Sequence, residues 1–445
     1  MSQITDTFDR LQATFDSGHT RSFEWRDGQL AALAKLFEEE RDAILGAVAA
    51  DVGKPIFEAF ATEFPVGEII STRAHLQKWM ETESVAVPPE QGNISVEVVH
   101  DPLGIALIIG AWNYPVQLTL GPLIAAIAGG NVAVIKPSEL VPNTAQVIQN
   151  AVEKHLDPKA FAVIQGGIPE TTELLSLHWD KIFFTGSPAV GKVVLRAAAE
   201  NLVPAVLELG GKSPAIVCED ANLDSAATRV TWGKFFNAGQ TCVGVDYALV
   251  HESRYEEFID KVADKVTEFF GEDPAKSADL ARIVNVPNLN RLVGLLDGQK
   301  IVCGGDFSED ERYLAPTVVR DVALDSPIMQ EEIFGPILPI RPYSNLDDAI
   351  EVVNDGERPL AAYFFTEDEQ TQQRLLTEIR SGGACINDVL LQAGQTEAPF
   401  GGVGHSGMGE YHGYDGYLAF THRRTVFEQS TESEPAVRHP PYPSF

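Results

Sequence analysis

The chain has 445 residues, more than one hydrophobic core usually supports, so two or three domains are expected. Its 44% hydrophobic and 22% charged residues are typical of a soluble globular protein. The formal net charge of −31 repels phosphate backbones and anionic lipids, which makes nucleic acid a poor partner, and adaptation to salt or solubility explains the acidity more simply.

The N-terminal segment, residues 1–85, is expected to form helices. It begins with Met1–Asp6, which lacks the basic start and apolar run of a secretory signal, so a cytoplasmic protein without a membrane anchor is expected. Gly53-Lys54-Pro55 interrupts the helical pattern. Apolar side chains share one helix face at Leu30, Leu33, Leu36 and Phe37. These helices should therefore cover a sheet.

A strand and a charge-free stretch follow. Ile94, Val96 and Val98 alternate with polar residues, which predicts an exposed or edge strand able to join a hairpin arm. Residues 102–135 contain no Asp, Glu, Lys or Arg and imitate a membrane span. Pro115, Pro122 and a glycine pair interrupt the stretch, which favours a buried strand, helix and strand.

Short apolar runs then alternate with helical patterns, as in a parallel, doubly wound sheet. Strands are expected at 105–109, 132–135, 161–164, 181–184 and 205–207, and helices at 117–128, 142–155 and 187–201. A second α/β domain is expected between about 209 and 400, with helices at 222–236 and 253–270 and strands near 215–217, 247–251 and 336–340. Ligands of such sheets bind at the carboxyl ends of the strands.

Cys242 and Glu208 are the candidate nucleophile and general base. Both lie in glycine-rich turns, Leu207–Pro214 and Asn237–Cys242, where a thiol and a carboxylate can meet. Glu208 ends an apolar strand at the expected ligand edge, where shielding from water would raise its pKa. The four cysteines, Cys218, Cys242, Cys303 and Cys385, show neither zinc nor disulfide spacing, and the histidines show no metal spacing.

Several other segments follow expected strands. The amide of Asn113, beside Trp112, could stabilise an oxyanion together with the Cys242 N–H. The segment Phe184–Gly191 opens a helix whose free N–H groups suit phosphate, although it lacks the middle glycine of G-x-G-x-x-G. Cofactor candidates in these segments are Trp112, Gly186, Ser187 and Gly191. Lys136 and Glu139, which follow the expected strand 132–135, and Glu332 with Phe334, which lie two residues apart at a turn, are further candidates.

Together these segments resemble the aldehyde dehydrogenase superfamily, and in particular its class 3 branch, from about residue 20 to 427. The matching stretches are Trp112-Asn113, Ile135–Glu139, Phe184–Ser187, Leu207–Lys212, Gly239–Cys242, Glu332–Pro336 and Pro399–Gly402. The short N-terminus, Ser406–Gly409 and Tyr411–Gly413 resemble the class 3 branch.

This resemblance implies an enzyme that uses NAD or NADP to oxidise a small-molecule aldehyde to a carboxylic acid. Cys242 would form the thiohemiacetal and thioester, Glu208 would activate water, and Asn113 with the Cys242 N–H would form the oxyanion hole. Lys136 and Glu139 would hold the adenine-side ribose. Gly186 and Ser187 would bind the pyrophosphate region, and Glu332 with Phe334 the nicotinamide ribose and ring.

The implied fold has two doubly wound, Rossmann-like parallel-sheet domains and a small β oligomerisation arm, and the implied assembly is a homodimer. The expected domains are a cofactor-binding domain (1–85 and 102–208), a catalytic domain (209–404), the arm (86–101 and 405–427) and a C-terminal tail (428–445).

Departures from the family pattern lie near the substrate mouth, at Val243-Gly244-Val245, Gln392 and Tyr414, so aromatic, medium-chain aliphatic and apocarotenoid-like aldehydes all stay open. An acylating enzyme that passes the thioester to coenzyme A, a cysteine hydrolase and a non-catalytic relative are the alternatives. Glu208 argues against the acylating enzyme, because it can activate water, and the cofactor motifs argue against the hydrolase. The presence of both Cys242 and Glu208 argues against a non-catalytic relative.

Overall fold

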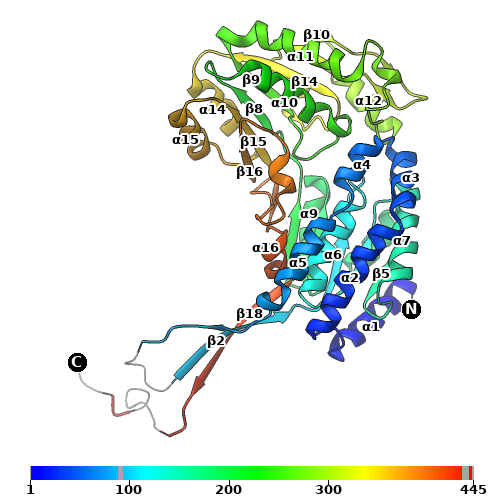
Figure 1. The fold of residues 1–445 in the computed structure, drawn as a ribbon, viewed down its shortest axis with the longest axis vertical. Helices are drawn as coiled ribbons and strands as arrows, with labels where there is room; N and C mark the ends of the chain where they lie inside the picture. Colours follow the sequence, from blue (N-terminus) through cyan, green and yellow to red (C-terminus); the bar gives the residue numbers. More distant parts are fainter. Residues whose placement is uncertain (1, 89–93, 433–439, 443–445) are drawn as a thin grey trace.

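The computed structural model of the chain describes residues 2–88, 94–432 and 440–442. Two sheet-containing units lie one above the other, and a thin β arm projects from the lower unit (Figure 1). The expected arm segment 86–101 and tail 428–445 fall partly outside the described residues. No helix in the described ranges is long and apolar enough to cross a membrane.

The N-terminal segment is helical, as expected. Its helices are α1 (Gln3–Asp16), α2 (Phe23–Glu39), α3 (Arg41–Val52), α4 (Ile56–Thr62) and α5 (Val66–Trp79). Ser2 and Ser22 cap α1 and α2, each accepting a backbone N–H with its side chain. Gly53, at φ 59°, ends α3 in the left-handed region that glycine tolerates. The apolar face of α2 is buried, as its spacing predicts.

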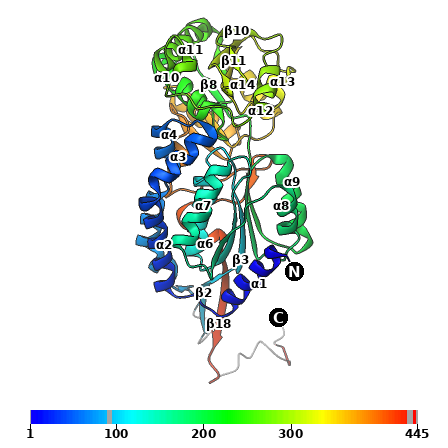
Figure 2. The same cartoon turned by 90° about the vertical axis from the view of Figure 1, so that its right-hand side faces the viewer.

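The lower unit contains a six-stranded sheet of order β17-β7-β6-β3-β4-β5, parallel except for β17. Its strands are β3 (Ile105–Ile109), β4 (Val132–Lys136), β5 (Phe161–Val163), β6 (Lys181–Thr185), β7 (Ala205–Glu208) and β17 (Gly407–Met408). Its helices are α6 (Gln117–Ala128), α7 (Pro142–His155), α8 (Ile168–Leu175) and α9 (Pro188–Glu200). Helices α2, α6 and α7 cover one face, and α8 and α9 the other (Figure 2).

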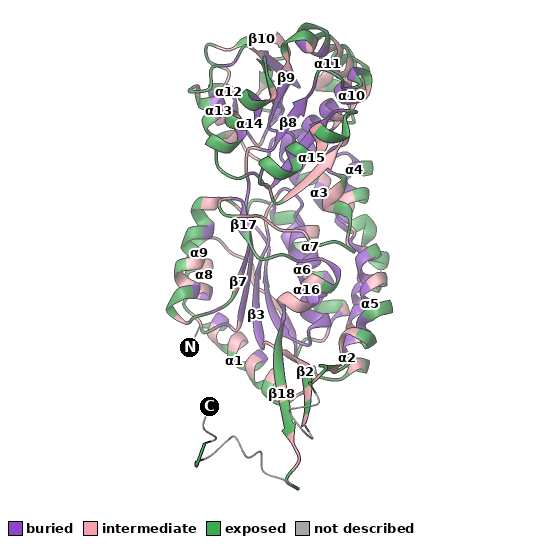
Figure 3. Ribbon diagram, turned by 90° about the vertical axis from the view of Figure 1, so that its left-hand side faces the viewer, coloured by how far each residue is buried: buried purple, intermediate pink, exposed green. Residues whose placement is uncertain are grey.

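The charge-free stretch forms β3, α6 and β4, which confirms the buried strand, helix and strand. Every residue of β3 and β4 is buried, and so are almost all of α6. The strands run as a buried layer through the lower unit (Figure 3). Such all-round burial explains why these runs carry no charge.

The upper unit contains a seven-stranded sheet of order β10-β13-β14-β9-β8-β15-β16, parallel except for β10. Its strands are β8 (Pro214–Val217), β9 (Tyr247–His251), β10 (Lys300–Cys303), β13 (Thr317–Arg320), β14 (Ile337–Tyr343), β15 (Ala361–Phe365) and β16 (Gly383–Ile386). Its helices are α10 (Leu223–Phe235), α11 (Tyr255–Phe270), α12 (Val286–Gly294), α13 (Pro327–Gln330), α14 (Leu346–Asp355) and α15 (Glu369–Glu378), and β11 (Phe307–Ser308) pairs with β12 (Tyr313–Leu314).

The arm is a three-stranded antiparallel sheet of β1 (Glu83–Ser84), β2 (Ile94–Pro102) and β18 (Thr421–Gln429). Within the expected arm segment 405–427, only β18 continues into the arm. Strand β17 pairs with β7, and α16 (Gly413–Ala419) packs on the lower unit through the buried ring of Tyr417. The buried aromatic residues Tyr411 and Phe420 hold this segment against the six-stranded sheet.

Candidate active site

Cys242 lies just after a tightly folded turn between α10 and β9. The turn is a short 3-10 helix, η2 (Phe236–Gly239), in which Asn237 and Ala238 adopt φ values of 52° and 51°. Such conformations cost about 1–3 kcal/mol each outside glycine, so surrounding contacts must enforce them. At Gly239 a Cβ atom would lie 2.2 Å from the Gly335 carbonyl oxygen, so only glycine fits. The loop before Cys242 is therefore held in one conformation.

Hydrogen bonds join this loop to the one that carries Asn113. Asn237 Nδ2 donates to the carbonyl oxygens of Asn113 (3.0 Å) and Gln240 (3.1 Å), and Asn113 Nδ2 donates to the Gln240 carbonyl oxygen at 3.1 Å. Gln240 Oε1 in turn accepts the Val284 N–H at 3.0 Å. Asn113 follows β3 of the lower sheet and Cys242 precedes β9 of the upper sheet. The structure thus brings together two candidate oxyanion donors that lie far apart in sequence.

Glu208 ends β7 at the carboxyl edge of the lower sheet, as expected. Its side chain is buried, and neither carboxylate oxygen has a hydrogen-bond partner in the described part of the chain. Burial without compensating contacts raises its pKa well above the ordinary carboxyl range. A carboxylate left without partners in a protein interior is a candidate for proton transfer to a ligand.

Nearby carboxylates affect the pKa of the Cys242 thiol. Burial, followed by the negative charges of Glu332 and Glu208, raises its pKa to about 12. The charges of two carboxylates from separate segments thus act on one sulfur. At neutral pH the resting thiol is therefore mostly protonated.

Glu332 and Phe334 lie in the segment that follows α13. Burial raises the pKa of Glu332 to about 8, and its Oε1 has no hydrogen-bond partner among the described residues. A Cβ atom at Gly210 would lie 2.0 Å from Glu332 Oε2, so only glycine fits at this position. The Phe334 and Trp112 rings pack edge to face at 5.4 Å. This segment thus provides an aromatic ring packed on Trp112 and a carboxylate whose charge acts on the Cys242 sulfur.

The remaining cofactor candidates lie along the carboxyl ends of neighbouring strands. Lys136 ends β4, is buried, and donates to Glu139 Oε2 at 3.4 Å. Ser187 caps α9, and Gly186 donates its N–H to the Glu208 carbonyl oxygen at 3.0 Å. Gly191 packs on Leu209, where a Cβ atom would approach Leu209 Cδ2 to 2.7 Å. The N-terminus of α9 and the ammonium group of Lys136 could thus bind a ligand that carries phosphates.

These residues fit a bound dinucleotide. Buried polar atoms without partners in the described ranges line this edge: Thr185 Oγ1, both carboxylate oxygens of Glu208 and Glu332 Oε1. Buried polar atoms are rarely left without partners, so a polar ligand is expected to supply them.

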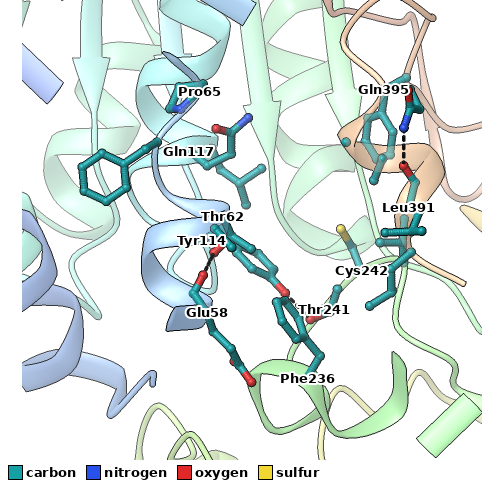
Figure 4. A pocket seen from close by; sticks show the side chains of 18 of the residues that line it. Glu58, Thr62, Pro65, Tyr114, Gln117, Phe236, Thr241, Cys242, Leu391 and Gln395 are labelled. Atoms are coloured by element: carbon teal, nitrogen blue, oxygen red, sulfur yellow. Dashed lines mark hydrogen bonds between the residues drawn. The ribbon is translucent and has the colours of Figure 1, made fainter. Parts of the chain in front are cut away.

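A cavity of about 850 Å³ opens on the other side of Cys242. Its walls are mainly apolar and include Phe57, Trp232, Phe236, Phe269, Leu391 and Phe400. The Cys242 thiol points into the space between Tyr114 and Leu391 (Figure 4). Phe57 and Leu391 are 78% and 52% exposed, so the apolar lining continues to the surface. The cavity therefore suits an apolar substrate reaching the thiol.

Glu58 is a polar exception that the sequence did not reveal. It lines the cavity, and its Oε2 accepts the Asn237 N–H at 2.9 Å. Burial raises its pKa to about 7, against the opposing effects of that hydrogen bond and of Lys54. In the sequence it looks like an ordinary surface residue of an amphipathic helix, because nothing local marks the turn that it contacts.

One group outside the site offers metal-ligand atoms despite the absence of metal spacing among the histidines. Glu39, Glu40 and His155 place one ligand atom each within 4.8 Å of one another. Lys154 also pairs with Glu39 at 3.6 Å and Glu40 at 2.6 Å, so a cation already lies among these carboxylates.

Comparison with known proteins decides the family, because the aldehyde dehydrogenase family matches residues 2–426. The chain belongs to the aldehyde dehydrogenase family. It is 42% identical to the dimeric NADP-preferring aldehyde dehydrogenase of Rattus norvegicus, over 100% of the chain and 99% of the relative. It is 44% identical to aldehyde dehydrogenase family 3 member A2 of Pongo abelii, over 97% of the chain and 90% of the relative. The class 3 resemblance is thus confirmed.

Solved structures of aldehyde dehydrogenases confirm the expected fold. A substrate-bound aldehyde dehydrogenase of Staphylococcus aureus superposes with a TM-score of 0.97 at 45% identity, covering 99% of this chain and 97% of that one. The NAD⁺ complex of the Bacillus cereus aldehyde dehydrogenase has a TM-score of 0.86 at 27% identity, covering 96% and 88%. This aldehyde dehydrogenase is an enzyme that oxidises aldehydes with NAD or NADP.

Proposed function

We propose that Cys242 is the nucleophile of this aldehyde dehydrogenase. Its thiolate attacks the aldehyde carbon to form a thiohemiacetal, and loss of hydride leaves a thioester on the sulfur. The assignment rests on the position of Cys242 in the wall of an apolar cavity, with the charges of Glu208 and Glu332 acting on its sulfur. Asn113 is hydrogen-bonded to the loop just before Cys242. Because the resting thiol is protonated, attack requires a proton to leave the sulfur first.

Asn113 Nδ2 and the Cys242 N–H are proposed to hold the oxyanion that develops on the aldehyde oxygen. Asn113 Nδ2 carries two hydrogens, and the Gln240 carbonyl oxygen engages this group at 3.1 Å. That bond orients the amide and leaves a second N–H for the substrate. Fixed donors of this kind stabilise the tetrahedral state because they need no reorganisation during the reaction.

Glu208 is proposed to activate the water that hydrolyses the thioester. Its unpartnered, buried carboxylate and raised pKa support a general base. A general base for water favours hydrolysis of the thioester over transfer of the acyl group to coenzyme A. The product is then a carboxylic acid.

The dinucleotide is proposed to lie along the carboxyl edge of the lower sheet. Lys136 and Glu139 would bind the adenine-side ribose, Gly186, Ser187 and Gly191 the pyrophosphate region, and Trp112, Glu332 and Phe334 the nicotinamide end. When bound, NAD or NADP supplies the acceptor for the hydride. In this proposal residues 1–85 and 102–208 form the cofactor-binding domain and residues 209–404 the catalytic domain.

The carboxylate of Glu139 is expected to disfavour NADP, because it would repel the 2′-phosphate that distinguishes this cofactor. Glu139→Gln should therefore raise kcat/KM for NADP several-fold relative to NAD. The measurement is the ratio of the two specificity constants at saturating aldehyde. Glu153→Gln, an exposed change on α7, is the matched control, and an unchanged ratio in Glu139→Gln contradicts this contact.

A large apolar aldehyde is proposed as the substrate. The cavity volume, its apolar lining and the exposed Phe57 and Leu391 at the rim support this class. A relative from Staphylococcus aureus that is 45% identical, over 99% of this chain and 97% of its own length, is named 4,4'-diaponeurosporen-aldehyde dehydrogenase.

For straight-chain aldehydes we expect kcat/KM to rise by roughly fourfold per added methylene until the cavity is filled, because burying one CH₂ is worth about 0.8 kcal/mol. Aldehyde-dependent reduction of NAD and NADP across a series of chain lengths measures this slope. Aromatic aldehydes belong in the same series. A flat profile contradicts the apolar substrate class, whereas no reduction with any aldehyde contradicts the assigned reaction.

A homodimer in the cytoplasm is proposed as the working form. The β2–β18 sheet projects away from the body of the chain and supports an arm for association (Figure 1). The rat relative is named dimeric. All four cysteines are free, which suits a reducing compartment.

A further inference from the structure

Lys54 and Glu63 form a buried ion pair next to the active site. They flank α4, with Lys54 before its first residue and Glu63 after its last, and Lys54 Nζ lies 2.6 Å from Glu63 Oε1. Neither side chain is accessible to solvent, and neither lines the apolar cavity. A buried ion pair is costly unless its remaining donors and acceptors are satisfied. Their other partners therefore indicate what the pair does.

The ammonium group of Lys54 holds the segment that carries the proposed oxyanion donor. It donates to the Asn113 carbonyl oxygen at 3.0 Å and lies 3.9 Å from the centre of the Tyr114 ring. The Tyr114 hydroxyl is in turn 2.6 Å from Thr241 Oγ1, one residue before Cys242. One cation thus fixes the backbone at Asn113 and, through an aromatic ring, contacts the loop of the nucleophile.

The carboxylate of Glu63 holds the other end of the same segment. Its Oε2 accepts the N–H groups of Val116 (3.0 Å) and Gln117 (3.1 Å) at the start of α6. Val116, the N-cap residue of α6, provides no side-chain hydrogen bond of its own. Glu63 therefore caps this helix from outside, where a negative charge also suits the helix dipole.

We infer that the Lys54–Glu63 pair positions the Asn113 side-chain amide for stabilising the oxyanion. The inference rests on the proposed role of Asn113 and adds two positioning residues that touch neither aldehyde nor cofactor. Residues 113–117 are held by Lys54 at one end and Glu63 at the other, and Asn237 Nδ2 adds a second donor to the Asn113 carbonyl oxygen. Because the oxyanion exists only in the tetrahedral state, loss of the pair lowers kcat and leaves KM nearly unchanged.

The test is a double-mutant cycle between Lys54→Met and Asn113→Ala, measured on kcat and KM for aldehyde oxidation. Removing one oxyanion donor typically costs about 10²–10³-fold in kcat, which is the loss expected for Asn113→Ala. Lys54→Met alone should cost about 10–100-fold in kcat, since a displacement of about 1 Å at a catalytic group can cost about 10²-fold. In the Asn113→Ala background, Lys54→Met should cost less than about twofold, because the group it positions is absent.

Folding is controlled by a second variant and by a lysine elsewhere. Lys54→Met combined with Glu63→Gln removes both charges, and the glutamine carbonyl still accepts the Val116 N–H, so the pair variant should fold even if Lys54→Met alone does not. The same cycle is then run with the pair variant. Lys181→Met is the matched control, because Lys181 is buried in β6, burial lowers its pKa to about 8, and it begins the strand whose opposite end faces the site. This control should keep kcat within about twofold of the wild type.

The outcomes separate the two proposals. If Asn113→Ala keeps full kcat, the oxyanion role of Asn113 is wrong. If Asn113→Ala is impaired but the Lys54 change costs the same in both backgrounds, the positioning role is wrong while the oxyanion role stands. A rise in KM at constant kcat likewise overturns positioning, because it assigns the pair to substrate binding. Coupling with KM unchanged, and thermal unfolding close to that of Lys181→Met, supports the inference.

Discussion

Replacement of Cys242 by alanine is expected to abolish aldehyde oxidation, lowering kcat by on the order of 10⁴–10⁶, as removal of a nucleophile does in other enzymes that form covalent intermediates. Cys218, Cys303 and Cys385 all lie within or directly after strands of the upper sheet. The measurement is aldehyde-dependent reduction of the cofactor at saturating concentrations of both substrates.

Cys303→Ala is the control for the loss of a thiol. Cys303 is half-buried at the end of β10, the antiparallel strand at the sheet edge, so its replacement should leave kcat unchanged. Cofactor binding, followed by the change in protein fluorescence on titration, should be retained in Cys242→Ala. Cofactor reduction at the wild-type rate in Cys242→Ala would contradict the assignment.

Because the pKa of the Cys242 thiol is raised, its reactivity as a nucleophile should depend on pH. A thiol whose pKa is about 12 is mostly protonated at neutral pH, and the thiolate fraction rises about tenfold for each pH unit below that value. Alkylation of the resting enzyme by iodoacetamide, followed as loss of activity, should therefore accelerate steadily between pH 7 and pH 10. A rate that levels off near pH 8 would show that the thiol is not held protonated by its surroundings.

Much of the fold could be predicted from the sequence, because its signals are local. The sequence predicts helices at 117–128 and 142–155, and α6 and α7 have those bounds in the structure. The long apolar run of α6 and the periodic burial of α7, which begins at Pro142, are properties of their own segments. Strands β13, β15 and β16 are not among the strands expected from the sequence.

The candidate site was only partly predictable for the same reason. Cys242, Glu208 and Asn113 lie in unusual turns that mark them in the sequence. Lys54, Glu58 and Glu63 carry no such mark, because their roles depend on which loops lie beside α4 in space. The left-handed conformations of Asn237 and Ala238 were likewise hidden, since neither residue is a glycine and long-range contacts enforce the turn.

Replacement of Glu208 by glutamine should separate the two halves of the reaction. The thiol is untouched, so the first turnover should still reduce about one cofactor per active site. Hydrolysis of the thioester then lacks its base, and steady-state turnover should fall about 10²–10⁴-fold. Stopped-flow absorbance of the reduced cofactor would record a burst followed by this slow phase.

Hydroxylamine provides the control for Glu208→Gln, because it is a small nucleophile that attacks thioesters without help from a general base. It should restore turnover and release the hydroxamate of the substrate acid. If the burst is lost together with the steady state, Glu208 acts before the thioester forms, and its assignment to hydrolysis is wrong.

Thioester hydrolysis is expected to depend on pH through Glu208. Glu208 acts as a base only when ionised, and burial raises its pKa, so the rate in the wild type should fall as the pH drops through that raised pKa, well above the range of an exposed carboxyl. Cys242 no longer contributes to this titration, because its sulfur is bonded to the acyl group. Single-turnover hydrolysis of the acylated enzyme should therefore rise with pH in the wild type and lose this rise in Glu208→Gln. Retention of the same inflection in the variant would mean that another group removes the proton from water.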